Sequence, residues 1–181
     1  MLIPIMDLKI ILPAAGMLTM PENPVQRLTA DAPAPALITD SRRERASVVA
    51  PGRHVDAALR DMILEGVRAL LVVGDDQTVL GLIAASDILG PRPVQFLQSP
   101  LCDGSPCRHK DVHVGDIMTT WAHLHLLDWI WVEASTCGDI AALFAGAETS
   151  HLLVVERVGD ATPIVRGLIS RTRLMRQLKL A

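Results

Sequence analysis

Two short stretches carry the residues best suited to binding chemistry. Leu80–Leu89 reads LGLIAASDIL, and Arg166–Met175 reads RGLISRTRLM. In both, a shared Gly-Leu-Ile leads into polar residues at the predicted start of a helix. The residue six places after the glycine is Asp87 in the first copy and Arg173 in the second. Because the start of a helix directs backbone N–H groups at one spot, each copy predicts a site for an anion or a nucleotide.

The second copy places two cations, Arg171 and Arg173, in the predicted first turn of a helix. Positive charge there is unfavourable by about 0.3–1 kcal/mol, and a nearby phosphate or carboxylate would relieve it. The alternative is a solvated basic face that also includes Arg176 and Lys179. The second site is therefore expected either to be inactive toward nucleosides or to be reshaped toward an anion.

Other kinds of chemistry find little support. No Ser-His-Asp, Cys-His or paired-carboxylate set stands at a usable spacing, and Gly-rich phosphate loops are missing, so we expect no enzyme. The spacing of Cys102, Cys107, His109 and His113 is irregular for a zinc site. The three cysteines, which include Cys137, are not spaced as a disulfide framework. We expect no metal and no required cofactor.

The composition limits which binding partners and which cellular compartment we expect. Half of the 181 residues are apolar and the net charge is −3, which argues against nucleic acid as a partner. The apolar segment 1–20 contains Asp7 and Lys9, is broken by Pro4 and Pro13, and has no basic start. It therefore fits neither a membrane span nor a signal peptide. We expect a cytoplasmic chain with no membrane partner.

The elements that must position these residues occur twice in the same order. The first set is a strand, a helix, two paired strands and a helix, at residues 47–50, 54–65, 69–73, 79–83 and 86–89. The second set is expected at residues 131–133, 136–147, 151–155, 165–169 and 171–178. Duplication on this scale predicts an α/β (α+β) fold of two βαββα repeats packed about a pseudo-twofold axis.

The motifs within the two sets match a known pattern. Asp116-Ile117-Met118-Thr119 precedes the second set and the weaker Leu37-Ile38-Thr39 precedes the first, while Leu70–Val73 matches Leu152–Val155. With the two Gly-Leu-Ile stretches, the chain from Ala36 to Leu178 resembles a pair of cystathionine-β-synthase (CBS) domains, known as a Bateman module.

The resemblance implies a regulatory module that binds AMP, ADP, ATP or S-adenosylmethionine between its repeats, often as a homodimer acting on an effector protein. One cleft would use Asp87 for the ribose, helped by Ser86, Ala84, Thr119, Ser150 and His151. The second cleft would use Thr39, Arg68, Ser170 and Arg173.

Two departures from the family pattern make the clefts unequal. Ala84 replaces a hydroxyl residue in the first cleft, and Arg173 replaces the ribose carboxylate in the second. Asp87 could instead be a plain helix cap, and His151 a strand residue satisfied by the backbone. A scaffold that dimerises with degenerate sites is therefore the alternative function.

The predicted domain organisation has four parts. These are a Pro-rich arm (1–35), a first repeat (36–90), a connector (91–113) and a second repeat (114–181) that contains an apolar insertion at 121–130. An apolar extension of this kind favours a contact between copies of the chain.

Overall fold

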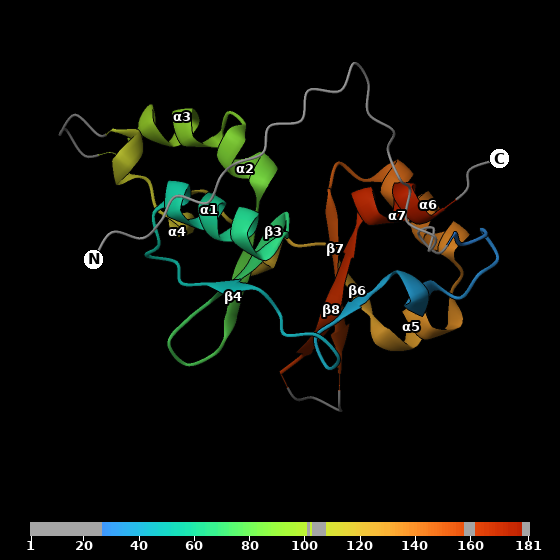
Figure 1. The fold of residues 1–181 in the computed structure, drawn as a ribbon. Coiled ribbons are helices and arrows are strands. Elements are labelled where there is room, and N and C mark those ends of the chain that lie inside the picture. Colours follow the sequence, from blue (N-terminus) through green and yellow to red (C-terminus); the bar gives the residue numbers. More distant parts are fainter. Residues whose placement is uncertain (1–26, 101, 103–107, 158–161, 179–181) are drawn as a thin grey trace, which may run out of the picture.

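Two four-stranded sheets organise the part of the chain that the computed structural model describes, residues 27–100, 102, 108–157 and 162–178 (Figure 1). The strands of the first sheet are, in spatial order, β2 (Val48–Val49), β3 (Ala69–Val73), β4 (Val79–Ala84) and β5 (Thr119–Thr120). Those of the second are β1 (Thr39–Asp40), β8 (Ile164–Ser170), β7 (His151–Glu156) and β6 (Leu126–Asp128).

Helices accompany each sheet. The first sheet has α1 (Val55–Glu65), α2 (Ala85–Leu89), α3 (Arg92–Leu97), α4 (Val114–Ile117) and the 3-10 turn η2 (His109–Asp111). The second has α5 (Trp129–Ala134), α6 (Cys137–Gly146), α7 (Arg171–Gln177) and the 3-10 turn η1 (Ala34–Leu37). A further 3-10 turn, η3 (Trp121–His123), follows β5 in the chain. None of the helices in the described ranges has the length and apolar character needed to cross a bilayer.

The two sheets are built alike. In each, a short strand pairs in parallel with the first hairpin strand, as β2 does with β3 and β6 with β7. Each hairpin is antiparallel and carries an irregularity at the same place, after Val72 in one and after Val154 in the other. Separate buried clusters lie under the two sheets, around Met62 and Ile83 in one and Ile140 and Ile169 in the other. The predicted mixed fold of two similar repeats is confirmed.

Each repeat supplies an edge strand to the other repeat's sheet. β1 lies within the predicted first repeat but pairs with β8, and β5 lies within the predicted second repeat but pairs with β4. The shared glycine of the two motifs explains how the strands fit. A Cβ at Gly81 would overlap the Thr119 carbonyl oxygen, and one at Gly167 would overlap that of Thr39. Glycine therefore lets the exchanged strand approach the backbone closely.

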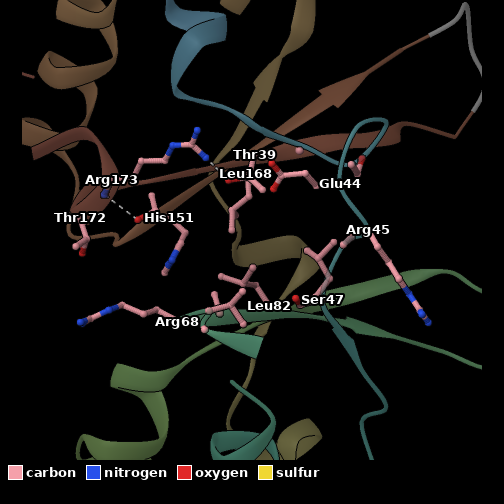
Figure 2. Close-up of a pocket in the computed structure, with 18 of the residues that line it drawn as sticks. Thr39, Glu44, Arg45, Ser47, Arg68, Leu82, His151, Leu168, Thr172 and Arg173 are labelled. Carbon is pink, nitrogen blue, oxygen red and sulfur yellow. Dashed lines mark hydrogen bonds between the residues drawn. The ribbon is translucent and has the colours of Figure 1, made fainter. Parts of the chain in front are cut away.

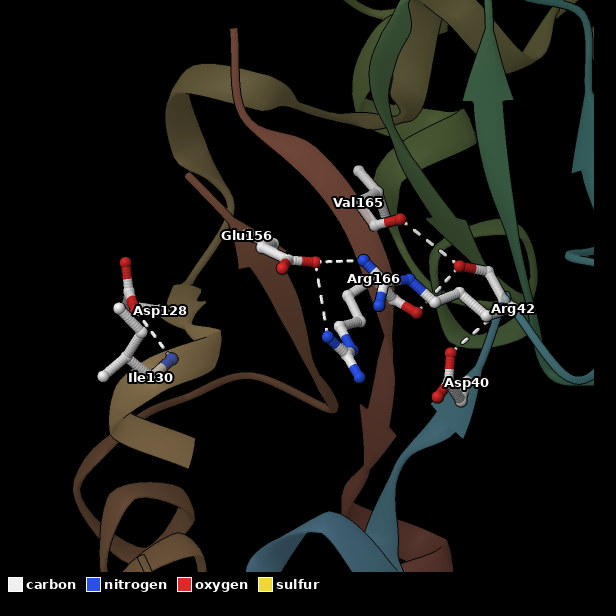
Figure 3. Close-up of polar contacts among 8 residues, drawn as sticks. Asp40, Arg42, Asp128, Ile130, Glu156, Val165 and Arg166 are labelled. Atoms are coloured by element: carbon white, nitrogen blue, oxygen red, sulfur yellow. Dashed lines mark hydrogen bonds and ion pairs between the residues drawn. The ribbon is translucent and has the colours of Figure 1, made fainter. Parts of the chain in front are cut away.

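The prediction of a strand at residues 131–133 is wrong. These residues belong to α5, and the strand lies earlier, at β6. Asp128 begins the helix, since its Oδ1 accepts the Ile130 N–H at 2.8 Å (Figure 3). Trp129 and Val132 then pack on the core at helical spacing. The segment 121–130 therefore contributes a strand to the second sheet, and the element with no counterpart in the first repeat is α5.

The N-terminal segment packs on the second repeat. Of the predicted arm, residues 1–26 lie outside the described residues, but Leu28 donates its N–H to the Gln177 carbonyl at 2.8 Å and is buried. Ala34 and Leu37 are buried in the same core. Residues 36–40, which the sequence assigned to the first repeat, therefore belong structurally to the second.

An ion-pair group holds the loop after β1 against the second sheet. Glu156 pairs with both Arg42 and Arg166, in the latter case over 3.3 Å (Figure 3). The guanidinium carbon of Arg166 lies 3.5 Å from the centroid of the Trp129 ring. This group fixes the start of the loop that goes on to line the candidate site.

Candidate functional site

A cavity of about 440 Å³ lies between the two repeats (Figure 2). Its walls come from both of them: β1 and the loop 41–47, residues 66–69 at the start of β3, and residues 170–177 at the end of β8 and in α7. Leu82 and Leu168, from the two facing sheets, form an apolar part of the wall. A ligand here would touch both repeats at once.

The cavity is strongly basic. Four arginines line it, Arg45, Arg68, Arg173 and Arg176, and its one carboxylate is Glu44. None of these four arginines forms an ion pair with any residue in the described ranges. The walls therefore hold positive charge that the described protein does not neutralise.

Neutral groups hold Arg173 in place. Its Nη1 donates to Thr39 Oγ1 at 2.8 Å and its Nε to Gln177 Oε1 at 3.3 Å. Its backbone N–H donates to Ser170 Oγ at 3.2 Å, which caps α7. Because these partners carry no charge, the guanidinium is positioned without losing its attraction for an anion.

His151 lines the cavity, and its side chain lies between those of Arg68 and Arg173 in the view of Figure 2. His151 is only 9% exposed, and this burial lowers the pKa of its imidazole to about 4. Its Nδ1 lies 2.8 Å from Ser150 Oγ. At neutral pH the ring is uncharged and can donate or accept a hydrogen bond toward a ligand.

In the first predicted cleft, Arg92 contacts both Asp87 and Thr119. Asp87 Oδ2 accepts the Ala84 N–H at 2.8 Å, and Asp87 Oδ1 lies 3.4 Å from Arg92 Nη1. The same Nη1 donates to Thr119 Oγ1 at 3.0 Å and to the Ile117 carbonyl at 2.9 Å. Arg92 thus connects Asp87 to Thr119, two residues that were predicted to line the first cleft.

Asp87 therefore has a measurable structural role. We expect Asp87→Ala to lower the free energy of unfolding by about 1 kcal/mol, since a helix cap and a partly exposed ion pair are lost. Chemical denaturation of the variant and the parent checks this. An unchanged unfolding midpoint would contradict the cap and ion pair described here.

The structure brings the residues predicted for the second cleft together in one cavity, but it does not do so for those predicted for the first cleft. All four residues of the second set, Thr39, Arg68, Ser170 and Arg173, line the cavity, and His151 from the first set joins them. Thr119 lines a separate, more open depression together with Arg92 and His123. Ser86, Ala84, Asp87 and Ser150 line neither.

Sequence reasoning missed three charged residues that line the cavity, and it missed Arg92. Glu44, Arg45 and Arg176 line the cavity from a loop and from the last helix. For Arg176, the available signal was the excess of arginine around the second motif. Arg92 lies in the segment predicted to be a connector, and nothing in its spacing from Asp87 indicated a contact.

Arg171 is a structural residue. Arg171 Nη2 donates to the carbonyls of Phe144, at 2.5 Å, and Ala147 near the end of α6. Cys102 is disulfide-bonded, which the sequence did not indicate, and Cys107 lies outside the described residues. Across the described ranges, no three His, Cys, Asp or Glu side chains are placed to hold a metal ion.

Comparisons with known proteins agree with this architecture. A family model of the CBS domain matches residues 43–90. No curated protein sequence matches the chain.

Solved structures match it over most of its length. CBSX2 from Arabidopsis thaliana in complex with AMP has a TM-score of 0.54 and 21% identity, over 80% of this chain and 94% of that one. An uncharacterized conserved protein from Pyrococcus horikoshii has a TM-score of 0.54 and 24% identity, over 84% and 98%. Residues 43–90 thus match the model of the CBS domain, and the chain has the fold of a CBS-pair protein.

Proposed function

We propose that the chain is a cytoplasmic regulatory CBS-pair module that binds an adenine nucleotide or another adenosyl ligand in the cavity between its repeats. The cavity itself carries the proposal, because its volume of about 440 Å³ lies in the range of small-molecule sites and both repeats line it. A structure with the same fold has AMP bound. A ligand that contacts both repeats would change how they fit together, and an effector protein would respond to that change.

The proposed site is the cleft of Arg173 rather than that of Asp87. Asp87 already accepts a backbone N–H and faces Arg92, so a ribose would have to displace an ion pair. The Arg173 cleft has a cavity of about 440 Å³ that polar residues line. No catalytic step is proposed for either cleft.

Ligand binding can be tested by thermal shift. We expect at least one of AMP, ADP, ATP, S-adenosylmethionine and NAD to stabilise the full chain, by about 2.7 kcal/mol at 100 times its dissociation constant. The shift should persist in Asp87→Ala, because that residue lies outside the cavity, and should shrink in Arg173→Gln.

The two variants show which cleft binds the ligand. A shift lost in Asp87→Ala but kept in Arg173→Gln would move the site to the first cleft. No shift with any of the five compounds would contradict the proposed ligand class.

A scaffold that forms homodimers is the second candidate, and exposed apolar side chains on the helices favour it. Ile63 and Leu64 at the end of α1 are 71% and 84% exposed, and Leu89 of α2 is 73% exposed. Ile130, at the end of the segment predicted to make a contact between copies, is 72% exposed. Sedimentation of a stable dimer, together with no response to any adenosyl compound, would favour the scaffold.

A further inference from the structure

The two copies of the repeated motif place opposite charges at one equivalent position. Asp87 and Arg173 each follow their glycine by six residues, and each lies just after the start of a helix that follows the hairpin. A carboxylate accepts hydrogen bonds from the two hydroxyls of a ribose, whereas a guanidinium has only donors. Its planar set of donors fits oxyanions such as phosphate. The charge reversal therefore changes which part of a ligand this wall can hold.

Arg68 lines the same cavity from the other repeat. It stands just before β3, is exposed, and has no side-chain hydrogen bond or ion pair to a residue in the described ranges. In Figure 2 the side chains of Arg68 and Arg173 come from opposite walls, with His151 between them. An anion held between the two walls would be attracted by both guanidinium groups.

We propose that this cavity selects its ligand by negative charge: it takes a compound with two or more phosphate groups, held by Arg68 and Arg173, in preference to uncharged or cationic adenosyl compounds. This inference rests on the proposed function, since it names the ligand class of the same site. Glu44, the cavity's one carboxylate, opposes such a ligand. Removing either arginine should therefore weaken the binding of a phosphorylated ligand, and removing the Glu44 carboxylate should strengthen it.

Calorimetric titration of the full chain with ATP, AMP, adenosine, S-adenosylmethionine and inorganic triphosphate tests the proposal. We expect affinity to rise from adenosine through AMP to ATP, with S-adenosylmethionine at the weak end. Arg173→Gln and Arg68→Gln should each weaken ATP binding about tenfold or more, because each removes a charge-assisted contact, and should leave adenosine unaffected. Glu44→Gln should strengthen ATP binding.

A matched control separates local from overall charge. Arg60 is an exposed residue of α1 that does not line the cavity, so Arg60→Gln makes the same change of net charge elsewhere. It should alter ATP affinity by less than about twofold, as expected for a distant exposed charge. Arg68 is also exposed, so Arg68→Gln remains informative even if Arg173→Gln does not fold.

The outcomes distinguish this inference from the proposed function. Adenosine or S-adenosylmethionine binding as tightly as ATP would overturn the selection by charge and leave the adenosyl site standing. Triphosphate binding as tightly as ATP, with no response to adenosine, would support the selection by charge and overturn the adenine ligand. Binding of none of the five compounds would overturn both.

Discussion

Replacing Gly167 with alanine should lower the free energy of unfolding by about 1–3 kcal/mol, the usual cost of overpacking. The added Cβ would overlap the carbonyl oxygen of Thr39 and stand 2.6 Å from Ile38 Cγ2. Neither group can move away easily, because β1 is paired with β8 at this point and Ile38 is buried in the core. The strand must therefore shift, and urea denaturation of the variant measures what that shift costs.

The same substitution should also weaken ligand binding. β1 carries Thr39, whose hydroxyl holds the Arg173 guanidinium at 2.8 Å. When β1 shifts, Arg173 loses that hydrogen bond. The loss should appear as a reduced thermal shift with the ligand that stabilises the parent chain.

Gly146→Ala is the matched control. Gly146 is the last residue of α6, and a Cβ there would meet nothing within 4 Å. Alanine at this site should be neutral or stabilising by up to about 1 kcal/mol, because it restricts the unfolded chain and favours the helix. If Gly167→Ala proved as stable as Gly146→Ala, the close approach of β1 to β8 described here would be wrong.

Acidification should destabilise the chain through His151. Burial lowers the pKa of this imidazole from 6.5 to about 4, so between these values the unfolded chain takes up a proton that the folded chain does not. The contribution of His151 to stability is therefore complete above about pH 6.5 and falls as the pH drops toward 4. The expected loss is about 3 kcal/mol between pH 7 and pH 4.

The variant His151→Gln isolates this contribution, because glutamine is polar, similar in size and does not titrate. Denaturation curves at pH 7, 5.5 and 4.5 for parent and variant give the difference in slope. The parent should lose stability faster than the variant as the pH falls. Parallel pH profiles would mean that the imidazole is not buried in an uncharged state.

The sequence by itself determined the repeat and much of its local structure. The helix over α1, both hairpins and the helix that follows each of them were predicted from apolar spacing and turn residues, because these signals are local. The duplicated Gly-Leu-Ile motif indicated the resemblance to a CBS pair, and that resemblance assigned Thr39, Arg68, Ser170 and Arg173 to one cleft. Which of these residues bind a ligand stays a prediction.

Only the tertiary structure decided how distant segments meet. Apolar spacing reports that one face is buried and does not name its partner, so the exchange of β1 and β5 between the sheets could not be read from it. The short apolar run that became α5 fits a strand or a helix equally well, and the cap at Asp128 and packing on η1 settled it. The contact of Arg92 with Asp87 depends on the path of the chain between α2 and α3. That contact, together with the open cavity at Arg173, moved the proposed site from the first cleft to the second.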